Sequence, residues 1–189
     1  MNLALMLAAL SVLFPAVARA DVKVGEEKSR LCSFCHDNGS HDGGLAPLLE
    51  AQPAPYLFGQ LKAFKDKRRV GGGMNTNTST MTDEDMRDIS EYFAAQELPL
   101  TPFKSDPVKV ALGRQTADDL KCAACHGPNY LGRNEIPRLA GQWWDYMSAQ
   151  LKNFRTGRRS HGGANATDVA RNPGLSEAEN LAHYFAQLK

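Results

Sequence analysis

Cysteine is scarce in this sequence, and neither sign of charge is in excess. There are 4 Cys among 189 residues, too few for a fold held together mainly by disulfide bonds. Lys and Arg together number 22 and Asp and Glu 21, a balance that indicates neither a nucleic-acid binder nor an acidic tail. With 42% hydrophobic residues, the chain is not expected to be disordered as a whole. Its length allows one large domain or two small ones.

The sequence also lacks an apolar run long enough to cross a bilayer comfortably. Residues 3–14 are uncharged and apolar, but a membrane-spanning helix needs roughly 20 such residues. The run is followed by Ala18-Arg19-Ala20, which fits a signal-peptidase site. We therefore predict that residues 1–20 are a signal peptide cleaved after Ala20, rather than a retained membrane anchor. The mature chain is then exported, most simply to a bacterial periplasm.

The rest of the chain contains two copies of one unit, related by an offset of 90 residues. This offset pairs many identical residues: Cys32 with Cys122, Cys35 with Cys125, His36 with His126, Pro47 with Pro137, Gln52 with Gln142, Tyr56 with Tyr146, Gln60 with Gln150 and Arg69 with Arg159. Three prolines between positions 99 and 107 indicate an extended connector. We predict two domains, residues 21–98 and 109–189, joined by a linker over 99–108.

Both halves are expected to be helical, because neither shows sustained strand alternation. Apolar residues recur at helical spacing over 55–67 and 143–154, and short amphipathic stretches at 24–31 and 110–121 lead into the cysteine motifs. Thr82 with Asp85 has the pattern of a helix-capping box, and Ser176 with Glu179 repeats it. The predicted fold class is all-α.

Each half carries one Cys-x-x-Cys-His motif, the attachment signature of c-type haem. Two thiols add to the haem vinyl groups, and the adjacent histidine coordinates the iron from the proximal side. A disulfide would explain neither the histidine nor the duplication. A thioredoxin-like dithiol needs a βαβ context, and a zinc site needs further ligands. We predict two covalent haems attached at Cys32, Cys35, Cys122 and Cys125, with His36 and His126 as proximal ligands.

Several segments are similar to the cytochrome c4 family. They are residues 136–142 (IPRLAGQ), 150–155 (QLKNFR) and 81–86 (MTDEDM), and the resemblance covers nearly the whole mature chain. It implies two tandem class I cytochrome c domains, each a few helices around one haem, with the two haems facing each other across a pseudo-twofold interface. It also implies that the carbonyls of Pro47 and Pro137 accept the Nδ1–H of the proximal histidines and so set their tautomer.

In class I domains a methionine sulfur usually provides the sixth iron ligand. The resemblance assigns this role in the first half to Met74, which lies 38 residues after His36. Met81 and Met86 are the alternatives, but both occupy helix-like positions where methionine more often fills the core.

The second half departs from this pattern. The offset places Ala164 opposite Met74, and Met147 lies within a predicted core helix. We expect His161, in the same loop, to coordinate the second iron. The alternatives are an open or water-ligated iron, or Asn165; His183 is a weaker candidate.

These features favour a diheme electron carrier that passes single electrons between periplasmic or membrane-bound redox proteins. The atypical second half leaves alternatives from another class, namely a haem enzyme, a sensor or the electron-acceptor subunit of a dehydrogenase. Net charge divides as −4 over residues 21–100 and +4 over 101–189, a dipole that could orient the protein on its partners. Arg155, Arg158 and Arg159 are expected either to pair with haem propionates or to form a solvated basic helix end.

Overall fold

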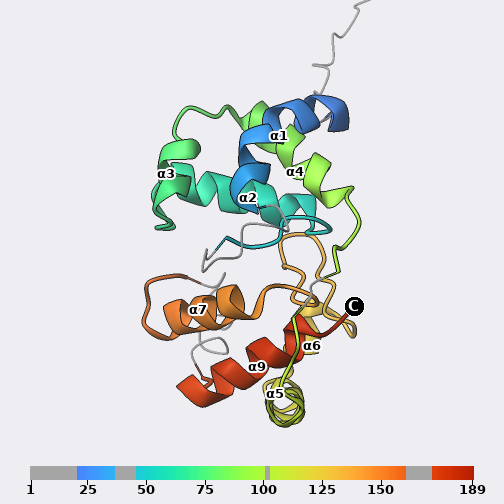
Figure 1. Ribbon diagram of the computed structural model, residues 1–189. Helices are drawn as coiled ribbons and strands as arrows, with labels where there is room; N and C mark the ends of the chain where they lie inside the picture. Colours follow the sequence, from blue (N-terminus) through green and yellow to red (C-terminus); the bar gives the residue numbers. More distant parts are fainter. Residues whose placement is uncertain (1–20, 37–45, 101–102, 161–171) are drawn as a thin grey trace, which may run out of the picture.

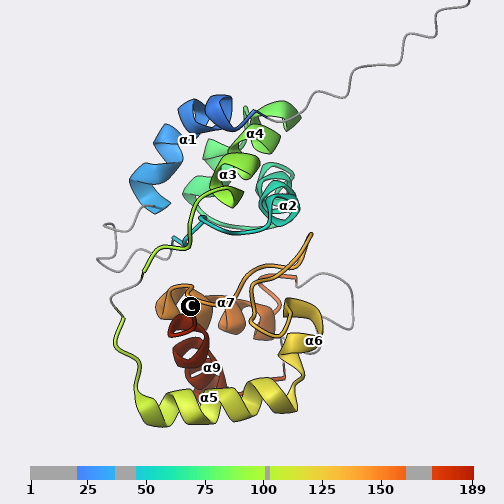
Figure 2. The same ribbon diagram turned by 90° about the vertical axis from the view of Figure 1, so that its right-hand side faces the viewer.

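The computed structural model describes residues 21–36, 46–100, 103–160 and 172–189, and over these ranges the chain forms helices and connecting loops. The first half contains α1 (Val22–His36), α2 (Ala54–Lys65), α3 (Gly73–Asn77) and α4 (Asp83–Ala94). The second half contains α5 (Pro107–Asp119), α6 (Cys122–His126), α7 (Trp144–Arg155) and α9 (Leu175–Ala186). Figures 1 and 2 show two stacked helical units, which confirms the all-α, two-domain fold.

The first and last helices of each half cross at a glycine. A Cβ on Gly25 of α1 would lie 2.1 Å from the carbonyl oxygen of Asp88 in α4. A Cβ on Gly113 of α5 would lie 2.1 Å from the carbonyl oxygen of Asn180 in α9. Any side chain at either position would force the helices apart, because packed interiors leave no spare volume. The two halves therefore share one helix crossing as well as one sequence pattern.

Each half has its own hydrophobic core. In the first, Leu57 and Leu61 of α2 pack against Met86, Ile89 and Phe93 of α4. In the second, Met147 of α7 packs with Leu181, Ala182 and Phe185 of α9, and with Ala117, Tyr130 and Ala140. Burying one large apolar side chain stabilises a fold by about 1.5–3 kcal/mol. Each half buries only a few of them, so a covalently bound cofactor would add substantially to its stability.

The capping box predicted from the sequence is present in the first half, whereas the one predicted in the second half is not. The capping box at Thr82 is confirmed: the Asp85 amide donates to Thr82 Oγ1 at 3.1 Å, and the Thr82 amide donates to Asp85 Oδ2 at 2.9 Å. The prediction that Ser176 and Glu179 form the equivalent capping box is wrong. Helix α9 begins at Leu175, and the Gly174 amide donates to Glu177 Oε2 at 2.5 Å, so the acid nearer the helix start is the one used.

The helices that lead into the cysteine motifs also differ between the halves. Helix α1 continues through its motif and ends at His36. In the second half the chain breaks at Lys121, whose φ of 54° is left-handed, and the motif forms the separate short helix α6. The preceding helix α5 begins at Pro107, earlier than expected, because Asp106 Oδ1 accepts the Val108 amide at 2.8 Å and caps it.

Two glutamines join the halves through reciprocal hydrogen bonds. Gln52 Nε2 donates to the Arg138 carbonyl and Gln52 Oε1 accepts the Arg138 amide, both at 3.0 Å. Gln142 makes the mirrored pair with Leu48, at 2.9 Å to its carbonyl and 2.8 Å from its amide. Because each partner maps onto its counterpart by the same offset of 90 residues, the interface is pseudo-twofold.

Candidate haem sites

The first haem motif ends with a histidine whose tautomer is set by a carbonyl. His36 is buried, and its Nδ1 lies 2.7 Å from the carbonyl oxygen of Pro47. Since a carbonyl can only accept, Nδ1 carries the proton and Nε2 keeps its lone pair for a metal. Burial lowers the pKa of His36, and Arg69 lowers it further against the opposing effect of the Pro47 carbonyl. The side chain is therefore held in the neutral form that binds iron.

The second motif reproduces this arrangement. His126 is equally buried, and its Nδ1 donates to the Pro137 carbonyl at 2.8 Å. Burial lowers its pKa as well. Both contacts expected from the resemblance are thus present, although the two motifs sit on helices of different length.

The two cysteines of each motif differ in their exposure. In each motif the first cysteine is partly buried and the second is exposed. Burial raises the pKa of Cys32, and it raises that of Cys122 to about 11. These thiols are therefore protonated at neutral pH and sit against apolar surroundings, Cys32 beside the first core and Cys122 beside the second. Two thiols and one neutral imidazole at this spacing fit a covalently bound haem in each half.

The methionines of the first half occupy different environments. Met74 lies on α3 and Met81 just before α4, and both are partly buried against the core cluster that Cys32 also adjoins. Met86 is completely buried within that cluster. Met86 is thus a core residue, while the choice of Met74 over Met81 as the iron ligand stays a prediction.

Two candidate iron ligands of the second half lie within the described residues and two do not. Met147 is buried in the core, as the sequence indicated. His183 is buried on α9, where its Nδ1 accepts the Asp106 amide at 3.2 Å and its ring lies 5.1 Å from that of Phe103 and 5.6 Å from that of Trp144. It anchors the linker to the second half, a role the sequence did not suggest. His161 lies outside the described residues, as does Asn165.

Two arginines meet between the halves. Arg69 donates to Gln60 Oε1 at 2.6 Å and crosses to the Tyr146 hydroxyl at 3.0 Å and Gln150 at 3.3 Å. Arg159 donates to Gln150 Oε1 at 2.7 Å and crosses to the Tyr56 hydroxyl at 3.0 Å and Gln60 at 3.1 Å. We call this set the interface cluster: Tyr56, Gln60, Arg69, Tyr146, Gln150 and Arg159.

The interface cluster concentrates positive charge. Among the described residues, every hydrogen bond from its two guanidinium groups goes to a neutral oxygen. Burial alone would raise the pKa of Tyr146, but Arg159 and Arg69 outweigh it and lower that pKa. An anion is therefore favoured here.

Only one of the three basic residues expected near the propionates reaches this interface. Arg159 does so, whereas Arg158 is exposed and Arg155 donates to the Pro173 carbonyl at 2.8 Å. Sequence reasoning overlooked Arg69 in this role. The repeat contained the signal, because Arg69 is the counterpart of Arg159 at the offset of 90.

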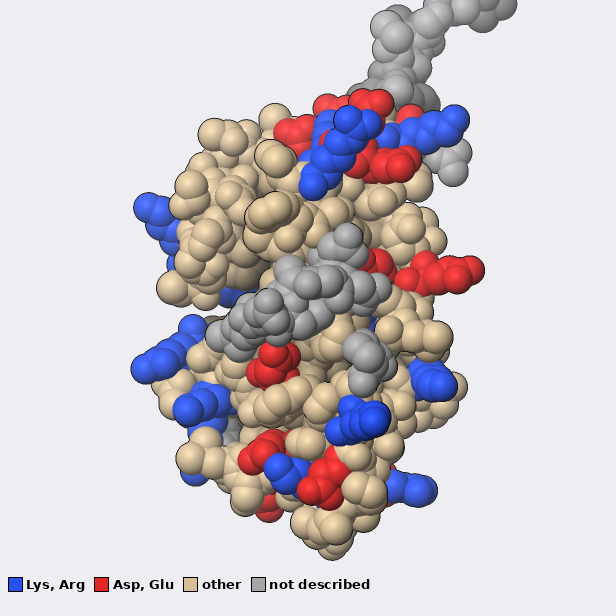
Figure 3. Space-filling view, viewed as in Figure 1, with Lys and Arg blue, Asp and Glu red and all other residues tan. Residues whose placement is uncertain are grey.

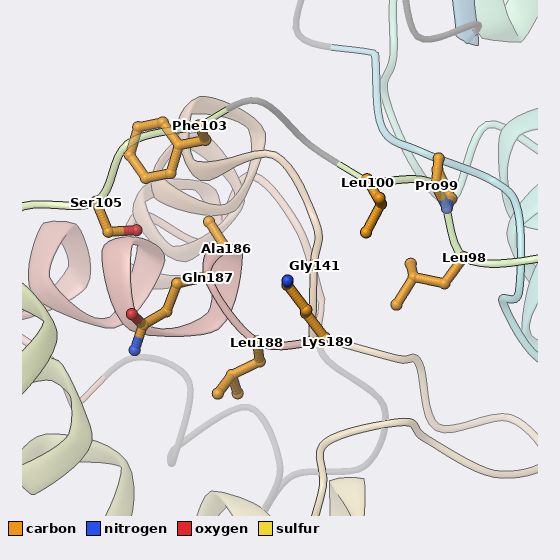
Figure 4. Close-up of a pocket in the computed structure, with 10 residues that line it drawn as sticks. All are labelled: Leu98, Pro99, Leu100, Phe103, Ser105, Gly141, Ala186, Gln187, Leu188 and Lys189. Carbon is orange, nitrogen blue, oxygen red and sulfur yellow. The ribbon is translucent and has the colours of Figure 1, made fainter.

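A separate pocket of about 480 Å³ lies where the linker passes the C-terminus. Figure 4 shows Leu98, Pro99 and Leu100 on one side and Ala186 and Gln187 on another. None of its lining residues is a candidate haem ligand.

Comparisons with known proteins agree with this geometry. The family model for cytochrome c matches residues 110–189. Cytochrome c4 of Pseudomonas aeruginosa is 32% identical over 78% of this chain and 78% of its own. The crystal structure of reduced cytochrome c4 from Pseudomonas stutzeri superposes with a TM-score of 0.81 at 27% identity, covering 90% of this chain and all of that one. A thiosulfate dehydrogenase electron acceptor of Stutzerimonas stutzeri is 28% identical over 83% of this chain and 78% of its own.

Proposed function

The chain belongs to the cytochrome c4 family, and on this premise we propose that it carries single electrons between redox proteins of a bacterial periplasm. Members of the family are diheme electron-transfer cytochromes, so the chain binds two covalent c-type haems and transfers electrons. The observation that carries the proposal is the duplicated contact of His36 with Pro47 and of His126 with Pro137. None of the described helices has the length and apolar character needed to cross a membrane.

Haem iron supplies the one-electron chemistry, and the chain's residues hold and tune it. Cys32 and Cys35 would carry one haem, with His36 presenting Nε2 to the iron. Cys122, Cys125 and His126 would do the same for the other. The hydrogen bond to each proline carbonyl keeps the imidazole in one tautomer and increases its basicity as a ligand. Neither half needs a protein acid or base for electron transfer.

We assign the sixth position of the first haem to Met74, which α3 places against the same core as Cys32. Thioether ligation favours ferrous iron, whereas a second imidazole lowers the potential. With Met74 as a ligand of the first haem and His161 as a ligand of the second, the first haem would be the higher-potential centre.

The interface cluster is suited to binding the carboxylates of the haems. Arg69 and Arg159 would receive the haem propionates, because both are half-buried cations whose described partners are neutral. Arg69 also acts electrostatically on His36. Charge at the interface therefore influences at least the first haem site directly.

A second candidate function is that of an electron acceptor for a dedicated dehydrogenase. The relative named a thiosulfate dehydrogenase electron acceptor favours it. Stopped-flow reduction of the oxidised protein by a thiosulfate dehydrogenase, compared with reduction by a general quinol-oxidising complex, separates the two. Fast reduction by the dehydrogenase together with slow reduction by the quinol-oxidising complex would identify the dedicated role.

The decisive test of simple electron transfer is carbon monoxide binding to the reduced protein. An electron carrier with two closed irons binds none readily, and His161→Ala then creates one carbon monoxide complex per chain. Phe103→Leu, a change in the linker, serves as a control that leaves both irons closed. If the unmodified protein binds one carbon monoxide at the second haem, that iron is open, and a ligand-binding or enzymatic function replaces the proposal.

A further inference from the structure

Helix α1 is preceded by Asp21, whose backbone nitrogen, backbone carbonyl and one carboxylate oxygen all form hydrogen bonds. Asp21 Oδ1 accepts the amides of Lys23 at 2.9 Å and Val24 at 3.4 Å, and the Asp21 carbonyl accepts the Gly25 amide at 2.8 Å. The Asp21 nitrogen itself donates to Asp88 Oδ1 in α4 at 3.0 Å. Asp21 is also the residue that signal-peptide cleavage after Ala20 would leave at the start of the mature chain.

The carboxylate that receives the Asp21 nitrogen is buried and charged. The side chain of Asp88 is 6% exposed, and its other oxygen lies 2.7 Å from Lys28 Nζ. Lys28 Nζ is shared with Asp85, also at 2.7 Å. Two carboxylates therefore face one ammonium, so these three side chains carry one negative charge in excess, and Asp88 is the buried member of the three. Figure 3 shows charged side chains gathered over the end of the molecule where α1 and α4 lie.

The second half provides an internal comparison. There too, the residue that caps the first helix donates its backbone nitrogen to a side chain of the last helix: Asp106 donates to His183 Nδ1 at 3.2 Å. This acceptor is a neutral imidazole, because burial lowers the pKa of His183. Asn180, whose carbonyl faces Gly113 as that of Asp88 faces Gly25, has a neutral side chain. The Asp21 nitrogen, at the expected cleavage site, thus donates to a carboxylate. The corresponding nitrogen of Asp106, which follows the linker, donates to a neutral group.

We propose that Asp88 is the binding site for the α-ammonium group of the processed chain, which begins at Asp21. Cleavage of the Ala20–Asp21 peptide bond by water converts the Asp21 amide into an amine that takes up a proton. The new ammonium then forms an ion pair with Asp88, so that Asp88 and Asp85 no longer share Lys28 as their only cationic partner. A positive charge at a helix start is ordinarily unfavourable, but the Asp21 and Asp88 carboxylates offset it here. Processing thereby tightens the α1–α4 crossing that presents the first haem motif.

The test begins with the exported holoprotein. Its intact mass should correspond to two haems on a chain starting at Asp21, and a chain starting at any other residue overturns the proposal. A second form carries Gly-Ser inserted between Ala20 and Asp21, so that after cleavage the Asp21 nitrogen is again an amide. Its first residue is verified by mass.

Amide hydrogen exchange then reports the stability of α1 and α4, with α5 and α9 as the internal reference. The extension should speed exchange in α1 about tenfold, which is less than the loss of a fully buried ion pair would give, because Asp88 keeps Lys28 as a partner. In the Asp88→Asn background the extension should change exchange less than about twofold, because no carboxylate is left to pair. In Lys28→Met the penalty of the extension should grow, since Asp88 then depends on the amine alone. An extension that leaves α1 unchanged in the unmodified background, or one with equal effects in all three, refutes the site.

Discussion

Arg69 of the first half and Arg159 of the second both donate to the hydroxyl of Tyr146, at 3.0 and 3.4 Å. One phenol oxygen thus links two like charges that are 90 residues apart in sequence. Such an arrangement is costly unless an anion accompanies it, since like charges at short range repel strongly in a buried setting. The haem propionates are the anions that the bound cofactor would bring, so the interface and the two redox centres share their electrostatics.

Removing one of these charges should shift a haem potential. We expect Arg69→Met to lower the reduction potential of the first haem by roughly tens of millivolts, because a lost nearby cation favours the oxidised iron. The second haem should shift less, since Arg69 acts on His36. A spectroelectrochemical titration measures both centres. Arg158→Met is the matched control, because Arg158 is exposed and should leave both potentials unchanged; equal shifts in the two variants would contradict the role of the interface cluster.

The helix crossings make a prediction about stability. Gly25→Ala and Gly113→Ala should each lower the free energy of unfolding by about 3 kcal/mol, because the added methyl would meet a backbone carbonyl that cannot move alone. Gly59→Ala on α2 is the control: nothing lies within 4 Å of its Cβ position, and the change should stabilise by up to about 1 kcal/mol. Denaturant unfolding of the ferric holoprotein compares the three variants. A crossing variant as stable as the unmodified protein would show that the helices can separate freely.

The choice of sulfur in the first half is testable by spectroscopy. Met74→Ala should abolish the weak long-wavelength absorption of ferric haem that arises from iron–thioether ligation, and it should lower the first haem's potential. Met81→Ala and Met86→Leu should retain the band, since we assign Met86 to the core. Loss of the band in Met81→Ala together with its survival in Met74→Ala would transfer the ligand role to Met81.

The linker anchor should depend on pH. Burial lowers the pKa of His183 below its usual 6.5, so the unfolded chain takes up a proton more readily than the folded one. Its contribution to stability is therefore complete above about pH 6.5 and declines as the pH falls through that value towards the folded pKa. His183→Asn keeps an acceptor near the Asp106 amide but does not titrate. Chemical denaturation at several pH values should show a steeper loss of stability between pH 7.5 and 5 for the unmodified protein than for His183→Asn, and identical slopes would exclude His183 as the titrating group.

Local sequence patterns determine the haem attachment sites, the duplication and the main helices of this protein. Cys-x-x-Cys-His identifies haem attachment because the two additions and the axial bond all involve neighbouring residues. The offset of 90 residues revealed the duplication, and helical periodicity identified the helices around 55–67 and 143–154, since both depend only on residues close in sequence. Pro47 and Pro137 could be assigned from the resemblance, and each lies within hydrogen-bonding distance of its histidine.

Only the tertiary structure decided which residues far apart in the sequence contact each other. No local signal says that Gly25 faces the carbonyl of Asp88, or that the nitrogen of Asp21 reaches that residue's carboxylate, because both contacts are set by the angle at which α1 crosses α4. The same is true of His183, which periodicity alone could not connect to Asp106, and of Arg69, which acquires its role only when the halves pack together. The sequence carries these residues, but only the packing of helices against one another brings their charges and hydrogen-bonding groups within reach.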